Sequence, residues 1–278
     1  MATSISLATV QISTINDQLL IPHDVIVVSS KGEFISSGTT SLVELLPSGD
    51  IIKTPLAGDS REEDCRREMA IEVDIYKRLG EHARLVKMKR WDPDAYTLTL
   101  EYMPNGTLES YLRSHFEQIP SSQKLGWISQ AAEAVSLLHV NGIIHCDIGP
   151  HNFLLDADFN LKIADFSGSS LDGSLAMVCA GTRYAMPDPE WKPRQPAKVE
   201  EDLFALGSMI YYIVTGEAPY EELPDDQVEE RFLDGVFPAV GGLLCGEAIT
   251  LCWHAKAHSA QAIREMVDAL FEQKVLEN

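Results

Sequence analysis

The sequence predicts an α+β fold of two packed subregions, because strand-like and helix-like segments are segregated along the chain. Up to about residue 103, most segments are short, rich in β-branched and aromatic residues, and separated by Gly, Pro and Asp. From residue 107 onward, apolar residues recur at helical spacing. The two patterns meet at the turn-forming stretch MPNG, residues 103–106. We therefore expect an N-terminal segment over 1–30, a strand-rich lobe over 31–103 and a helical lobe over 104–278.

The first part is expected to hold several strands and one helix. The helix is predicted from about Arg61 to Leu79, where Met69, Val73 and Tyr76 recur among charged residues. A hairpin turn is predicted at PSGD, residues 47–50. The segment over 1–30 is expected to add a strand or a cap to this lobe. The predicted strands are DVIVVSS (24–30), EFISS (33–37), SLVELL (41–46), DIIKT (50–54), RLVKMKRW (84–91) and YTLTLEYM (96–103).

The second part is expected to be mainly helical. Gly142 and Gly216 are typical helix C-terminal residues, since glycine adopts the left-handed conformation that ends many helices. The predicted helices are LESYLRSHF (108–116), KLGWISQAAEAVSLLHVNG (124–142), EDLFALGSMIYYIVTGE (201–217) and SAQAIREMVDALFEQ (259–273).

Composition limits the partners and the location of the protein. The chain has 278 residues and a formal charge of −20, from 22 Lys and Arg against 42 Asp and Glu. Such a charge repels nucleic acid and anionic membrane surfaces, so a phosphate ligand would need a local positive site. Five cysteines without a C-x-x-C pair indicate reduced thiols and a cytosolic or nuclear location. Neither a signal peptide nor an apolar run of membrane-spanning length is apparent in the sequence.

A set of polar residues recurs at an informative order and spacing. The stretch IIHCDIGPHNFLL, residues 143–155, places Asp147 and Asn152 in a polar loop between two apolar runs. Alone this is a weak signal, because Asp and Asn are common turn residues. However, Asp165 ends a strand-like run thirteen residues after Asn152, and Lys53 ends another, with Glu72 in the predicted helix nineteen residues later. A paired lysine and glutamate can place an ammonium group against phosphates.

From about Phe34 to Ala269 the sequence resembles the eukaryotic protein kinase family, in a divergent, fungal-like serine/threonine branch. HCDIGPHN (145–152) is similar to the catalytic loop and DFS (165–167) to the metal-binding motif. GTRYAMPDPEW (181–191) resembles the end of the activation segment, which would cover residues 165–190. The resemblance implies a bilobal fold with a small strand-rich N-lobe and a larger helical C-lobe. It also implies that Asp202 braces the backbone of the catalytic loop.

The resemblance further implies roles for individual residues. Asp147 would accept the proton of the substrate hydroxyl, Asn152 and Asp165 would bind Mg²⁺, and Lys53, held by Glu72, would clamp phosphates. The function implied is transfer of the γ-phosphate of ATP, with Mg²⁺, to a Ser or Thr hydroxyl of a protein, by an enzyme expected to be a monomer. The nucleotide would contact Ser36, Gly38, Ser41, Val43, Ile51, Lys53, Leu100, Glu101, Met103 and Leu154.

Several positions depart from the family pattern. Ser36 and Ser41 stand where the phosphate loop usually has glycines, and a positive φ there would be strained. Ile51 could crowd the adenine base. Cys146 replaces an arginine that can bind a phosphorylated activation segment, and Gly149 replaces a lysine near the transferred phosphate. Removing one such positive charge can cost roughly 10²–10³ in rate.

Two further hypotheses remain open at this point. The departures at Ile51 and Gly149, with the poor phosphate loop, favour a pseudokinase that acts as a binding or scaffold module. A small-molecule phosphotransferase also uses an H-x-D-x-x-x-x-N loop and a later Asp. It is disfavoured by GTRYAMPDPEW and by the helix that begins near Asp202, which are typical of kinases that act on proteins.

Overall fold

The computed structural model describes residues 14–15, 18–19, 30–56, 61–190, 192 and 195–276. The chain divides into two compact units, residues 1–70 with 88–102, and residues 71–87 with 103–278. Residues 71–87 thus come from the first part of the sequence but belong to the second unit. The predicted lobe boundaries stay a prediction.

Little of the N-terminal segment is described. Within it, β1 (Thr14–Ile15) and β2 (Gln18–Leu19) form a short antiparallel pair. The strand predicted over 24–30 lies outside the described residues except for its last position. The role expected for residues 1–30 therefore stays a prediction.

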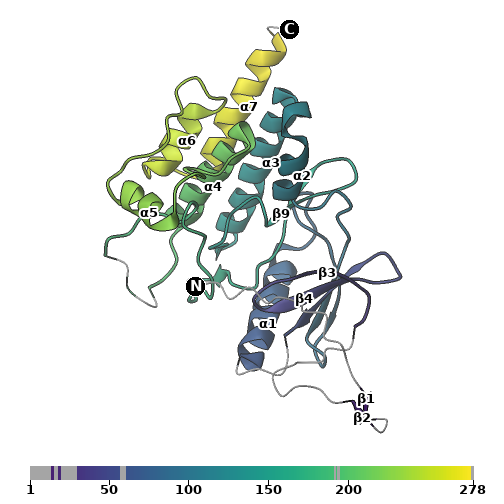
Figure 1. The fold of residues 1–278 in the computed structure, drawn as a ribbon. Helices are drawn as coiled ribbons and strands as arrows, with labels where there is room; N and C mark the ends of the chain where they lie inside the picture. Colours follow the sequence, from purple (N-terminus) through teal and green to yellow (C-terminus); the bar gives the residue numbers. More distant parts are fainter. Residues whose placement is uncertain are drawn as a thin grey trace. The chain divides into compact units, whose positions relative to one another are not determined.

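The first unit contains a five-stranded antiparallel sheet in the order β3-β4-β5-β7-β6 (Figure 1). Its strands match segments predicted from the sequence, and Gly49, with φ of +84°, lies in the predicted turn between β4 and β5. β6 begins at residue 88 rather than 84, because Leu85 instead forms a parallel bridge with Ile163 in the second unit. The strands are β3 (Glu33–Ser37), β4 (Ser41–Leu45), β5 (Ile51–Pro55), β6 (Met88–Asp92) and β7 (Thr97–Leu100).

Helix α1 (Glu62–Leu79) confirms the helix predicted between the strands. Its first turn is acidic and its last turn carries Lys77 and Arg78, which suits the helix dipole at both ends. The buried side chains Met69, Val73 and Tyr76 follow the predicted helical spacing. Residues from 71 onward in α1 belong to the second unit.

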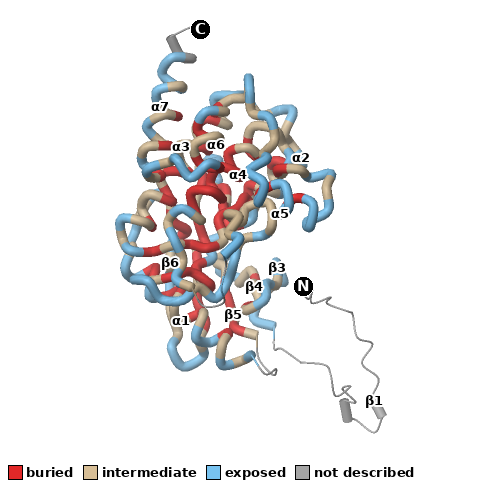
Figure 2. Tube along the Cα trace, turned by 90° about the vertical axis from the view of Figure 1, so that its left-hand side faces the viewer, coloured by how far each residue is buried: buried red, intermediate tan, exposed pale blue. Residues whose placement is uncertain are grey.

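The second unit is mainly helical, with α3 packed against α4 and α7, and α4 against α6 (Figure 1). Figure 2 shows that its buried stretches follow α3, α4 and α6. α4 is apolar around most of its circumference, as expected of a helix in the centre of a core. The helices are α2 (Leu108–His115), the 3-10 helix η1 (Phe116–Gln118), α3 (Ser121–Val140), α4 (Val199–Thr215), α5 (Asp225–Leu233), α6 (Gly246–Trp253) and α7 (Ala260–Leu276).

Two helices were not predicted from the sequence. α5 has nine residues and buries only Val228 and Phe232, so its apolar pattern is weak. α6 has eight residues and begins after Cys245, which has a left-handed φ of +59° and no capping hydrogen bond from its side chain. The weak apolar pattern of α5 and the missing side-chain cap of α6 explain why neither helix was predicted. Among the described residues, no helix has the combination of length and apolarity needed to cross a bilayer.

Short strands complete the second unit and frame its polar loops. β8 (Ile143–Ile144) pairs with β11 (Ser170–Leu171), and β9 (Phe153–Leu155) pairs with β10 (Leu161–Ile163), both antiparallel. β10 has a second neighbour, because Ile163 also donates to the carbonyl of Arg84 at 2.8 Å. These strands fix both ends of the loop over 145–152.

The prediction that Gly216 ends helix α4 in a left-handed conformation can be tested by substitution. Gly216 has φ of +82°, and a Cβ there would lie 2.9 Å from ring carbons of Phe116. We expect Gly216→Ala to lower the free energy of unfolding by about 1–3 kcal/mol, because it adds both strain and a clash. Urea denaturation measures the change.

The matched control is Gly126→Ala within α3, where a Cβ would have no neighbour within 4 Å. This variant should raise the free energy of unfolding by about 0.5–1 kcal/mol, because alanine loses less backbone entropy in a helix. Equal effects of the two substitutions on the free energy of unfolding would contradict the requirement for glycine at position 216.

Candidate active site

The loop over residues 145–152, which is the predicted catalytic loop, is braced by a buried carboxylate from α4. The backbone N–H groups of His145 and Cys146 donate to the two oxygens of Asp202 at 2.8 and 2.9 Å, and His139 Nε2 donates at 3.0 Å. Asp202 is 1% exposed, so these charge-assisted bonds offset the cost of burying its charge. The predicted brace is confirmed.

Asp147 and Asn152 are brought together within this loop. Asn152 Nδ2 donates to the backbone carbonyl of Asp147 at 2.8 Å and to its Oδ2 at 3.0 Å. Both hydrogen bonds are donated by Nδ2, so among the described residues Asn152 Oδ1 has no hydrogen-bond partner and could accept a ligand. Among the described residues, both hydrogen bonds to the Asp147 carboxylate are accepted by Oδ2, which leaves Oδ1 for another ligand.

Asp165 is placed beside Asn152 by the β9–β10 pair. Phe153 pairs with Ile163, and the N–H of Ala164 donates to the carbonyl of Asn152 at 3.0 Å. Asp165 is exposed with φ of +64°, and the hydroxyl of Ser167 donates to its Oδ1 at 3.1 Å. The hydroxyl of Ser167 thus orients the carboxylate of Asp165.

The donor chemistry of this pair fits magnesium. A carboxylate and an amide oxygen are hard ligands of the kind that Mg²⁺ prefers. The described residues contain no group of three or more His, Cys, Asp or Glu that could hold a metal by itself. A magnesium ion at Asn152 and Asp165 would therefore need water or ligand oxygens to complete its coordination.

A column of rings connects the loop to α1 within the second unit. His145 Nε2 donates to the carbonyl of Ala164 at 3.1 Å, and its ring lies 5.5 Å from that of Phe166. Phe166 packs edge-on against Tyr76 at 5.1 Å. Glu72 is fully buried and lies one turn before Tyr76 on the same face of α1. The predicted catalytic glutamate is therefore on the helix face that packs toward the loop.

The C-terminal end of α1 is tied to the start of the activation segment. Arg78 donates to both oxygens of Asp172, at 2.6 and 2.7 Å, and to the carbonyl of Asn141 at 3.3 Å. The hydrogen bond between Arg78 and Asp172 lowers the pKa of Asp172 and raises the pKa of Arg78. This bidentate contact supplements the ring column.

The remaining predicted nucleotide residues are divided between the two units. Lys53 lies in β5 opposite Val43 and Leu98 and is 6% exposed, which is unusual for a lysine. The predicted pairing of Lys53 with Glu72 stays a prediction. The residues of the first unit are Ser36, Gly38, Ser41, Val43, Ile51, Lys53, Leu100 and Glu101, whereas Met103 and Leu154 are in the second.

The phosphate-loop candidates form an ordinary hairpin turn. Gly38 donates to the carbonyl of Ser41 at 3.0 Å, and none of Ser36, Gly38 and Ser41 has a positive φ. The strain considered for the two serines is thus absent in this conformation. The backbone conformation therefore allows serine at positions 36 and 41.

His151 was missed by the sequence reasoning and lies directly beside Asp147. Its Nε2 is 3.2 Å from Asp147 Oδ2, and its ring covers Gly149. Partial loss of water around the ring lowers the pKa of His151, but its hydrogen bond to Asp147 and the negative charges of Asp147, Glu109 and Asp165 outweigh this and raise it. The only available signal was the glycine itself, whose missing side chain leaves room for a neighbour.

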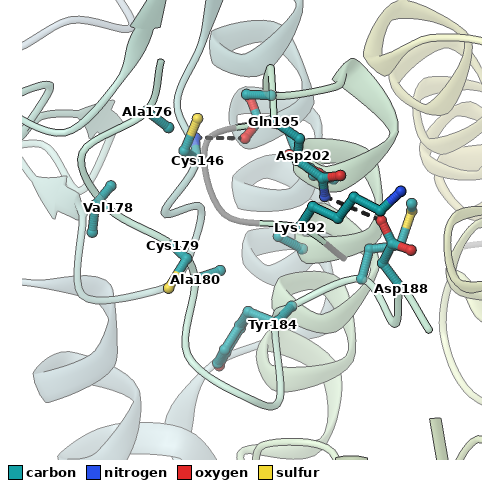
Figure 3. Close-up of a pocket in the computed structure, with 15 residues that line it drawn as sticks. Cys146, Ala176, Val178, Cys179, Ala180, Tyr184, Asp188, Lys192, Gln195 and Asp202 are labelled. Atoms are coloured by element: carbon teal, nitrogen blue, oxygen red, sulfur yellow. Dashed lines mark hydrogen bonds between the residues drawn. The ribbon is translucent and has the colours of Figure 1, made fainter. Parts of the chain in front are cut away.

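Cys146 lies on an acidic cavity of about 210 Å³ between the activation segment and the start of α4 (Figure 3). Burial raises the pKa of its thiol to about 12, so it remains a neutral, apolar side chain. The described lining contains the carboxylates Asp188, Glu201 and Asp202 but only one basic side chain, Lys192. Such a cavity does not suit a phosphate group.

Comparison of the sequence with known proteins identifies relatives of the chain. A family model described as "Protein kinase domain" matches residues 51–276. The chain is 28% identical over 238 residues to Aurora kinase from Eremothecium gossypii, covering 81% of the chain and 61% of that protein. It is 27% identical over 194 residues to Aurora kinase C from Mus musculus, covering 68% of each.

A further relative is the serine/threonine-protein kinase PLK4 from Nematostella vectensis. It is 31% identical to the chain over 155 residues, which cover 54% of the chain and 16% of that protein. The chain thus spans less than two thirds of the Eremothecium and Nematostella relatives.

The brace at Asp202 can be tested by substitution. Asp202→Ala removes the acceptor of two buried N–H groups, each of which costs about 1–3 kcal/mol when left unsatisfied. We expect the free energy of unfolding to fall by roughly 2–4 kcal/mol, measured by urea denaturation. Glu200→Ala is the matched control, because Glu200 lies exposed in the same turn of α4. A loss of stability no larger than that of the control would contradict the role of Asp202.

Proposed function

The chain belongs to the protein kinase family and is a protein kinase, and from this premise we propose that it transfers the γ-phosphate of ATP to Ser or Thr hydroxyls. The observation that carries the proposal is the arrangement around Asp147. One carboxylate oxygen is held by neighbouring donors and the other is left for a substrate hydroxyl. A carboxylate in this state can orient the hydroxyl and accept its proton.

The proposed roles of the other residues follow from their chemistry. Asn152 and Asp165 would hold Mg²⁺, which when bound supplies positive charge to the phosphate oxygens. This matters in a chain of formal charge −20, whose overall field opposes a nucleotide. Lys53, buried in β5, would contact the phosphates that are not transferred. Glu72, buried on α1, is proposed to form an ion pair with Lys53.

The choice of a Ser or Thr hydroxyl rests on two observations. Relatives such as PLK4 have serine/threonine-protein kinase in their names. The sequence also keeps Thr182 within GTRY at the end of the activation segment. A cytosolic or nuclear location and a monomeric state remain part of the proposal, and the five free cysteines support the former.

Phosphate transfer tests the proposal directly. Purified protein is incubated with γ-³²P-labelled ATP, Mg²⁺, and either casein or a degenerate Ser/Thr peptide library. We expect labelled product, loss of labelling with excess EDTA, and a decrease of about 10²–10⁴-fold in Asp147→Asn, because the general base is removed. Asp158→Asn, an exposed aspartate of the same unit, should keep the wild-type rate. An Asp147→Asn variant as active as wild type would refute the assignment.

Nucleotide binding is tested separately by thermal shift. A ligand that binds the folded state raises its stability with concentration by mass action, so Tm should rise with ATP when Mg²⁺ is present. The rise should shrink in Lys53→Ala, whereas Lys256→Ala, at an exposed position, should behave as wild type. A Tm that does not respond to millimolar ATP would count against ATP as the substrate.

A further inference from the structure

Gly149 is required by its neighbour rather than by its own backbone. Its φ is not positive, so the left-handed conformation that favours glycine does not explain the glycine here. However, a Cβ at this position would lie 2.6 Å from Cε1 and 2.8 Å from Nδ1 of His151. Real Cβ contacts are essentially never this short, so a side chain at 149 and the observed His151 ring exclude each other. Residue 149 therefore controls where the His151 ring can lie.

The direction of the His151 ring is set by Asp147. An ionised carboxylate can only accept hydrogen bonds, so the contact of 3.2 Å requires the proton on Nε2 of the imidazole. The side chain of His151 is 43% exposed, so packing into a core does not explain its position. The hydrogen bond to Asp147 and the close approach of the ring to Gly149 are the contacts on which its position depends here.

The bond from His151 adds to the one from Asn152 on the same oxygen. Asn152 Nδ2 and His151 Nε2 approach Oδ2 of Asp147 at 3.0 and 3.2 Å. Two donors on one oxygen restrict rotation of the carboxylate about its terminal torsion, which is otherwise broad. The orientation of the second oxygen, Oδ1 of Asp147, is then fixed as well.

We propose that His151 is a positioning residue for Asp147, and that Gly149 is present so that the imidazole can reach the carboxylate. This inference rests on the proposed function, in which Asp147 receives the proton of the substrate hydroxyl. His151 acts through Asp147 and needs no contact with the substrate.

Kinetics of four proteins test the proposal: wild type, His151→Ala, Gly149→Ala and the double variant. His151→Ala should lower kcat by about 10- to 100-fold, as expected for one hydrogen bond to a charged group, with KM changed less than about twofold. Gly149→Ala should lower kcat similarly, since its methyl group displaces the ring. The double variant should be no worse than His151→Ala, because the displaced ring is already absent.

Conservative and control variants sharpen the result. His151→Gln keeps an N–H donor at a similar reach and should recover part of the lost kcat. His258→Ala, at an exposed position, and Gly241→Ala, where a Cβ has no neighbour within 4 Å, should match wild type. A wild-type kcat in His151→Ala, or additive losses in the double variant, would overturn the inference.

A measurement without turnover separates this inference from the proposed function. In protein labelled with ¹⁵N-histidine, the His151 signal is identified by its loss in His151→Ala. Its imidazole shifts should indicate a proton on Nε2 and should change in Asp147→Ala and Gly149→Ala but not in Gly241→Ala. Unchanged shifts in Asp147→Ala would overturn the hydrogen bond even if the wild type transfers no phosphate.

Discussion

The bond pattern around the carboxylate of Asp202 is the constraint on which the catalytic loop depends. The N–H groups of His145 and Cys146 both point to it, which requires the left-handed φ of +67° at Cys146. Such a conformation costs a non-glycine residue about 1–3 kcal/mol. Hydrogen bonds to a charged group contribute about 1.5–3 kcal/mol each, so the pair offsets the strain. Because most residues of α4 are buried, the loop is attached directly to the core of its unit.

From this anchor, contacts continue through the second unit to helix α1. His145 is bonded by its backbone to Asp202 and by its ring to the carbonyl of Ala164, and it touches Phe166, which touches Tyr76. The latter half of α1 consequently belongs to the helical unit rather than to the sheet that precedes it in sequence. Glu72 and Asp147 are therefore positioned by one body of contacts. A change in the position of the Phe166 ring would therefore alter the positions of both Glu72 and Asp147.

The sequence allowed the main helices and the order of the polar site residues to be predicted, but not the details that depend on packing. α3 and α4 were predictable because each is a long stretch rich in apolar residues that is followed by a glycine. The brace from Asp202 came from the family resemblance. His151 escaped notice because its role depends on the space above Gly149, which no spacing rule encodes. The start of β6 was misplaced because Leu85 is apolar and β-compatible whether it pairs with a sheet or, as observed, with Ile163.

The activation segment is held by ion pairs, from Asp172 to Arg78 and from Arg183 to Asp225, and by short-range backbone contacts. Gly168 accepts the N–H of Met177 at 3.0 Å, and a Cβ at Gly168 would lie 2.3 Å from the side chain of Val178. Arg183 further along donates to the carbonyl of Tyr220 at 3.2 Å. Near Cys146 the surrounding carboxylates make the local field negative, so a phosphate on this segment would be repelled rather than bound there. Close packing, backbone hydrogen bonds and these ion pairs thus define the path of the segment without a cation at position 146.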